Sequence, residues 1–192
     1  MTRDFAWINP PPRWAGDAAA LELETAPSTD FWRETFYGFT RDSGHAWLAP
    51  VEGDFTASAR FRGDYRALYD QAGLMVMETG GEAWAKAGVE FTDGRMHFSV
   101  VTSAPRSDWS VIPLAAATPA SLVTARVTRH GDALRVQYAV DGGPWAMARL
   151  AAFVPGPVRV GPMACSPERG GFVARFEGLE IGPPIARALH AD

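Results

Sequence analysis

The chain has 192 residues, of which 47% are hydrophobic and 21% charged, a composition typical of a globular protein and not of a disordered chain. Its formal net charge of −4 argues against a nucleic-acid partner, because such a partner requires a basic surface. The single cysteine, Cys165, excludes an internal disulfide and a cysteine-based zinc site. We expect one domain covering residues 1–192.

The opening segment is rich in proline around Pro10–Pro12, which favours an extended arm. After it, runs that alternate or are rich in β-branched and aromatic residues predict about twelve strands. They are Ala18–Glu24, Ala46–Ala49, Phe55–Arg62, Gln71–Glu78, Ala83–Phe91, Met96–Thr102, Asp108–Ile112, Leu122–His130, Leu134–Val140, Trp145–Arg149, Val158–Ala164 and Phe172–Ile181. Only 64–70 and 184–189 could form a helical turn. The pattern predicts an all-β sandwich or jelly roll of two antiparallel sheets, with the last strand beside Ala18–Glu24.

Side chains alternate between the two faces of a strand, so the sequence also predicts which face is core. The core set is Phe55, Ala57, Ala59, Phe61, Leu74, Val76, Ala85, Ala87, Val89, Phe91, Met96, Phe98, Val100, Leu134, Val136 and Tyr138. Arg135 and Gln137 then point outward, and the arginines between 126 and 135 are predicted to form a solvated face. Short turns join 71–78, 83–91 and 96–102, which should therefore be neighbours.

The non-core faces of these three strands form one mixed surface of polar and aromatic side chains. It is made of Gln71, Met75, Trp84, Lys86, Glu90 and Ser99. Lys86 and Glu90 lie about 13 Å apart along their strand, so each needs a partner on another element or a ligand. Since neither packs in the core, we expect replacement of either to change stability by less than about 1.5 kcal/mol.

The remaining polar residues give weaker signals. The histidines at 45, 97, 130 and 190 lack metal-ligand spacing, and no cofactor motif is present. His45 lies in a predicted loop and is a candidate acid or base, with a structural role as the alternative. Cys165 is predicted to be a buried, slowly reacting thiol. Asp108 could bind a ligand hydroxyl with Trp109 as a stacking platform, although tryptophan is mostly a core residue.

Neither a secretory signal nor a membrane span is visible in the sequence. The segment that follows Met1 has no apolar stretch, and no run approaches the ~18 apolar residues of a span. We therefore expect a cytoplasmic protein without a membrane partner.

Five segments in order resemble a family of uncharacterised proteins named for a yeast member linked to regulation of enolase. They are Asp30–Phe39, Tyr69–Met75, Trp84–Glu90, Ser107–Ser110 and Gly161–Pro167. The resemblance covers nearly the whole chain. It implies a concanavalin A-like lectin/glucanase sandwich in which one curved sheet offers a groove, and it implies no reaction.

Carried over residue by residue, the family pattern marks fifteen positions. They are Trp32, Tyr37, Gly38, Asp42, His45, Asp70, Gln71, Lys86, Glu90, Ser99, Asp108, Trp109, Arg149, Cys165 and Ser166. Four of them, Gln71, Lys86, Glu90 and Ser99, also lie on the mixed surface. Related sandwich glucanases carry Glu-x-Asp-x-x-Glu on one strand. The most similar segment of this chain begins at Glu52 and lacks the last glutamate, which argues against that hydrolase chemistry.

Three functions follow as hypotheses. The first is binding of a carbohydrate or another polyhydroxylated small molecule, for which aromatic and polar residues on a concave sheet argue. Its ligand-binding set is Trp32, Tyr37, His45, Gln71, Trp84, Lys86, Glu90, Ser99, Asp108 and Trp109. The second is an enzyme of unassigned class that acts on a sugar-like substrate through Glu90 or His45. The third is a protein-interaction role or regulation of a metabolic enzyme. An edge strand could pair two copies into a homodimer.

Overall fold

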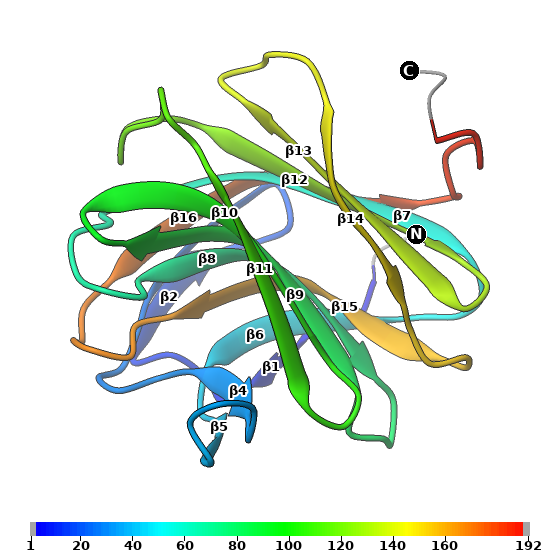
Figure 1. Ribbon diagram of the computed structural model, residues 1–192, viewed down its shortest axis with the longest axis horizontal. Helices are drawn as coiled ribbons and strands as arrows, with labels where there is room; N and C mark the ends of the chain where they lie inside the picture. Colours follow the sequence, from blue (N-terminus) through cyan, green and yellow to red (C-terminus); the bar gives the residue numbers. More distant parts are fainter. Residues whose placement is uncertain (1–2, 190–192) are drawn as a thin grey trace.

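The computed structural model describes residues 3–189, and His190 lies outside this range. Two seven-stranded antiparallel sheets pack face to face (Figure 1). The first, called the pocket sheet, has the order β1 (Ala6–Ile8), β6 (His45–Val51), β15 (Val158–Cys165), β8 (Gln71–Glu78), β9 (Trp84–Thr92), β10 (Arg95–Ser103) and β11 (Ser107–Pro113).

The second, called the back sheet, has the order β14 (Ala146–Ala152), β13 (Ala133–Val140), β12 (Val123–His130), β7 (Phe55–Gly63), β16 (Val173–Gly182), β3 (Ala20–Glu24) and β2 (Arg13–Gly16). A small hairpin of β4 (Phe31–Arg33) and β5 (Thr40–Asp42) lies outside both sheets, in blue in Figure 1. The all-β sandwich predicted from the sequence is confirmed.

The predicted strand neighbours are also confirmed. β8, β9 and β10 are consecutive in the pocket sheet, and β16 pairs with β3. The sequence missed β1, β2, β4 and β5, which are three or four residues long and too short to show an alternation. Neither 64–70 nor 184–189 is helical, and no helix in residues 3–189 could span a membrane.

The main core lies between the sheets and contains the predicted inward-facing side chains, with Phe91 and Tyr138 partly buried at its margin. A second apolar cluster covers the other face of the pocket sheet. There, Phe31 and Trp32 of β4 pack with Met75, Trp84 and Cys165. Cys165 is fully buried, as predicted. Because β4 covers this face, the pocket sheet is buried on both sides.

The prediction of a solvated arginine face is wrong for two of its arginines. Arg129 is 3% exposed and Arg135 2% exposed. Carbonyl groups of neighbouring loops surround the guanidinium of Arg129, which donates to Gly131 and Val154 at 3.0 and 2.9 Å. Arg135 donates to the Ala188 carbonyl at 2.9 Å, so the chain after β16 covers it. Gln137, also predicted to be outward, is buried as well. Loops and the tail can cover a polar face that alternation alone assigns to solvent.

Candidate functional site

A pocket of about 240 Å³ lies where the β4–β5 hairpin meets the pocket sheet. Strands β8 to β11, the hairpin, and the loops that precede β4 and β8 or follow β15 supply its lining. These residues are Asp30, Trp32, Tyr37, Phe39, Arg41, Tyr69, Gln71, Lys86, Glu90, Val101, Trp109, Pro167 and Glu168.

Strand register sets the floor of the pocket. Gln71 lies opposite Glu90, and four residues along the strands Met75 lies opposite Lys86. Between these two rows Gly73 lies opposite Gly88, so the strands present no side chain there. A Cβ at Gly88 would lie 2.1 Å from the Ala72 carbonyl oxygen, which means that the two strands also require glycine for their close approach. The glycine pair therefore leaves a gap between Lys86 and Glu90.

Lys86 finds its partner in the loop that precedes β4. Its Nζ donates to Asp30 Oδ1 at 3.2 Å, and the Lys86 side chain is only 6% exposed. Burial alone would lower the Lys86 pKa, but attraction to the carboxylates of Asp30 and Glu90 outweighs it, and the net pKa is raised. The cation is thus held permanently charged at the pocket floor.

Glu90 is incompletely satisfied. Ser99 Oγ donates to its Oε2 at 3.2 Å, and Ser99 in turn accepts a hydrogen bond from Trp109 Nε1 at 3.0 Å. Oε1 is buried and has no hydrogen-bond partner among residues 3–189. Burial raises the pKa of Glu90 to about 7, against the opposing effects of Lys86 and Ser99. At neutral pH this carboxyl group can both take up and release a proton.

Aromatic rings form the walls above this floor. Trp32 and Trp109 meet edge to face with centroids 6.4 Å apart, and Trp32 also packs on Tyr37 at 5.6 Å. The hydroxyls of Tyr37 and Tyr69 lie 3.5 Å apart. This contact, together with burial, raises the pKa of Tyr69 to about 12, so the Tyr69 phenol keeps its proton at neutral pH. Trp109 is 40% exposed and offers ring surface to a ligand.

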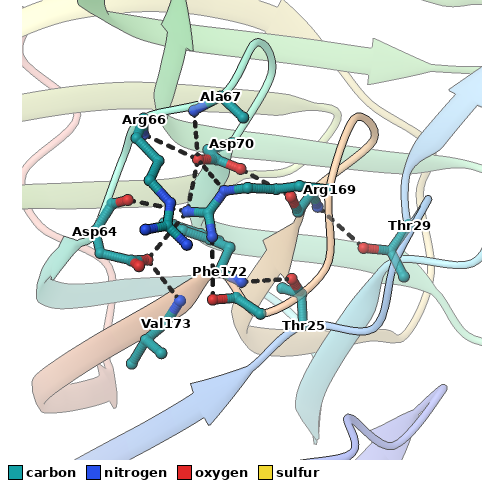
Figure 2. Close-up of polar contacts among 11 residues, drawn as sticks. Thr25, Thr29, Asp64, Arg66, Ala67, Asp70, Arg169, Phe172 and Val173 are labelled. Carbon is teal, nitrogen blue, oxygen red and sulfur yellow. Dashed lines mark hydrogen bonds and ion pairs between the residues drawn. The ribbon is translucent and has the colours of Figure 1, made fainter.

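A buried polar cluster around Asp70, here called the hub, joins the loop that precedes β8 to the loop that follows β15 (Figure 2). Asp70 is fully buried and accepts hydrogen bonds from Ser166 Oγ at 2.8 Å and from the Arg66 and Ala67 amides at 3.0 Å. Arg169 Nη2 pairs with it at 2.9 Å. The hub lies at chain positions adjacent to pocket residues: Tyr69 and Gln71 flank Asp70, and Pro167 and Glu168 lie between Ser166 and Arg169.

Of the ten side chains predicted to bind a ligand, six line the pocket: Trp32, Tyr37, Gln71, Lys86, Glu90 and Trp109. Ser99 lies behind it and orients two of these through hydrogen bonds. Trp84 faces the same side but packs into the second apolar cluster. Asp108 is turned away and pairs with Arg149 at 2.8 Å.

His45 lies outside the pocket lining. Its Nε2 accepts a hydrogen bond from the Ala26 amide at 3.0 Å, and its Nδ1 lies 2.5 Å from the Asn9 carbonyl oxygen. Burial lowers the pKa of His45, against the opposing effect of the Asn9 carbonyl. The ring is therefore a neutral group that joins two backbone segments, and no acid-base role can be assigned to it from this geometry.

The other lining residues were not among those predicted from the sequence. They are Asp30, Phe39, Arg41, Tyr69, Val101, Pro167 and Glu168. Asp30, Phe39, Tyr69 and Pro167 lie inside segments that carry the family resemblance, which was a usable signal. Arg41 and Glu168 lie outside those segments, so nothing in the sequence marked them as pocket residues. No group of three or more metal-ligating side chains occurs in the described part of the chain.

Comparison with known proteins gives a family and a fold. Residues 7–184 match the model of a family described as protein of unknown function (DUF1349). A Saccharomyces cerevisiae protein named Regulation of enolase protein 1 is 44% identical over 185 residues, covering 96% of this chain and 92% of the relative.

Two solved structures place the fold. A functionally unknown protein from Saccharomyces cerevisiae superposes with a TM-score of 0.88 at 42% identity, covering 95% of this chain and 97% of that one. The GH43 protein BlXynB of Bacillus licheniformis superposes at 0.67 with 13% identity, over 93% of this chain and 36% of the longer protein. At that identity the second likeness concerns the fold alone.

Proposed function

This chain belongs to the DUF1349 family of proteins of unknown function, and we propose that it binds a carbohydrate or another polyhydroxylated small molecule in the pocket beneath the β4–β5 hairpin. One observation carries the proposal: aromatic walls stand over a buried floor of hydrogen-bonding groups. Aromatic faces suit the apolar faces of a sugar ring, and Glu90, Lys86 and Gln71 suit its hydroxyls. The volume of about 240 Å³ fits a ligand of one ring better than a long oligosaccharide.

Thermal shift against a panel of monosaccharides, polyols and sugar phosphates tests this function. A ligand present at a hundred times its Kd should add about 2.7 kcal/mol of stability. Trp109→Ala should remove the shift, because it removes the exposed ring face. Trp145→Ala is the matched control, since Trp145 is 38% exposed but lies outside the pocket lining. Stabilisation that survives Trp109→Ala, or no stabilisation by any compound, would contradict the proposal.

A second function, proton transfer to or from a bound substrate, is favoured by one observation. Glu90 combines a pKa of about 7 with a free carboxyl oxygen at the pocket floor, as a general acid or base requires. The test is exchange of ligand C–H protons with deuterated water, followed by NMR. The enzyme hypothesis predicts exchange above the buffer rate that Glu90→Gln abolishes. Exchange at the buffer rate for every compound that binds would reject it.

A further inference from the structure

The floor of the pocket has an unequal charge balance. Lys86 has its nearest carboxylate in Asp30, at 3.2 Å, so these two charges largely compensate each other. Glu90 receives one hydrogen bond, from the neutral Ser99, and its Oε1 has no partner among residues 3–189 although the side chain is only 3% exposed. An ionised carboxylate in such a place requires a cation or several donors.

The rest of the lining does not supply that cation. At the rim, Arg41 and Glu168 have opposite charges, and the guanidinium of Arg41 lies over the Phe39 ring at 4.7 Å. The lining as a whole therefore has three carboxylates against two cations, which leaves one negative charge when Glu90 is ionised. A ligand with one positive charge would neutralise the pocket.

We infer that the ligand carries a protonated amine that pairs with Oε1 of Glu90, so that an amino sugar or another amine-bearing polyol is preferred over a neutral one. The inference rests on the proposed binding function and specifies its ligand. A charged donor makes a stronger hydrogen bond to a carboxylate than a hydroxyl does. The faces of Trp109 and Tyr69 also attract a cation more than a neutral group.

Several other groups face Glu90 and bear on its ionisation. Lys86 lies on the same strand as Glu90, Gln71 lies opposite Glu90 on β8, and His97 and Ser99 lie on β10. Asp30 and Tyr69 act from the preceding loops. Because Glu90 must be ionised to pair with an amine, affinity for the amine should fall as the pH drops below about 7.

Calorimetric titration with glucosamine, N-acetylglucosamine and glucose at pH about 7 tests the inference. Glucosamine should bind at least about tenfold more tightly than the two neutral sugars. Glu90→Gln should reduce that preference to less than about threefold, because it removes the charge and keeps the shape. Glu22→Gln, on the back sheet, is the control that keeps the preference, since its side chain is 56% exposed and pairs with Arg175.

A second arm uses the unmodified protein, in case Glu90→Gln does not fold. Between pH about 7 and about 5.5, affinity for glucosamine should fall about tenfold while that for glucose stays constant. The same loss in His97→Asn would show that His97 is not the titrating group. Equal or tighter binding of the neutral sugars overturns the amine inference but leaves the binding function intact, whereas no binding by any of the three sugars or the wider panel overturns both.

Discussion

Lys86 and Asp30 form a buried ion pair that joins β9 to the loop before β4, with 3.2 Å between Nζ and Oδ1. Their side chains are 6% and 13% exposed, so little water screens the pair. Asp30 Oδ1 also accepts the Phe31 amide at 2.8 Å, at the start of β4. The pair therefore fastens the hairpin to the pocket sheet and forms part of the pocket floor.

This geometry revises the stability effect expected for Lys86 from the sequence. Removing one partner of a buried pair leaves a charge without compensation, so Lys86→Met should destabilise the fold by about 3 kcal/mol, with Asp30→Asn in the same direction. The double variant should cost less than the sum of the single ones. Urea denaturation of the wild type, the two single variants and the double variant measures this coupling. Additive losses of unfolding free energy would show that the two side chains do not stabilise each other.

Glu90 should make stability depend on pH in an unusual direction. The folded protein keeps its proton up to pH about 7, whereas the unfolded chain releases it above about 4.3. In this window the folded state binds more protons, so its stability falls as the pH rises, by at most about 4 kcal/mol from this group. The contribution is constant below about 4 and again above about 8.

Glu90→Gln isolates that contribution, because glutamine does not titrate. The difference in unfolding free energy between wild type and Glu90→Gln should shift in favour of the variant from pH about 4.5 to about 8, then stay level. Denaturation at a series of pH values measures it. A difference that stays flat across the window would show that Glu90 titrates normally.

The two glycines of the floor allow a sharper steric test. A Cβ at Gly88 would lie 2.1 Å from the carbonyl oxygen of Ala72, a backbone atom that cannot move without breaking the β8–β9 pairing. Gly88→Ala should therefore cost more than about 3 kcal/mol. Gly182→Ala is the control, because no atom lies within 4 Å of its added Cβ, and its effect should stay within about 0.5 kcal/mol. Comparable melting temperatures for the two variants would contradict this account.

Cys165 should react with thiol reagents only when the protein opens. The thiol is fully buried, and burial raises its pKa despite the nearby Lys86, so little thiolate forms. Labelling should be slow in the native protein and rapid in denaturant, and as the only cysteine it gives a single-site rate. Rapid native labelling without loss of the β-sheet signal in circular dichroism would show access to the second apolar cluster.

The sequence predicted the long strands and their faces because alternation over seven or more residues leaves little freedom of register. It could not predict the β4–β5 hairpin, whose three-residue strands are held by tertiary contacts: Phe31 and Trp32 pack on the pocket sheet, and Asp30 pairs with Lys86. Since that hairpin covers the face of the pocket sheet that points away from the main core, the site is a pocket with a buried floor where an open groove was expected.

Tertiary contacts that the sequence pattern does not reveal also explain why the predicted site residues differ from the observed ones. Alternation placed Lys86, Glu90 and Trp84 correctly on one face, but only the hairpin decides that the first two line a pocket and the third is buried behind it. His45 looked available because it lies near a loop and has a titratable ring. Its backbone partners, at Asn9 and Ala26, are far away in sequence and leave no local trace.

The side chain of Asp70 joins the loop that precedes β8 to the loop that follows β15 (Figure 2). Asp70→Asn removes the charge that faces Arg169 at 2.9 Å and replaces one acceptor oxygen by a donor. Two backbone amides donate to Oδ2, so the asparagine oxygen must occupy that position. The new amide group then lies at the Oδ1 position, where Ser166 Oγ loses the acceptor that it now has. We expect a loss of about 3–5 kcal/mol in unfolding free energy.

Asp64→Asn is the control, because Asp64 contacts the same Arg169 at 3.2 Å but keeps 39% of its side chain exposed. It should cost about 1 kcal/mol. If the hub positions the pocket, Asp70→Asn should weaken ligand binding even well below its melting temperature, since Tyr69 and Gln71 are its chain neighbours. Calorimetric titration at low temperature separates the two effects: unchanged affinity in a folded but less stable Asp70→Asn would show that the hub stabilises the sandwich without shaping its pocket.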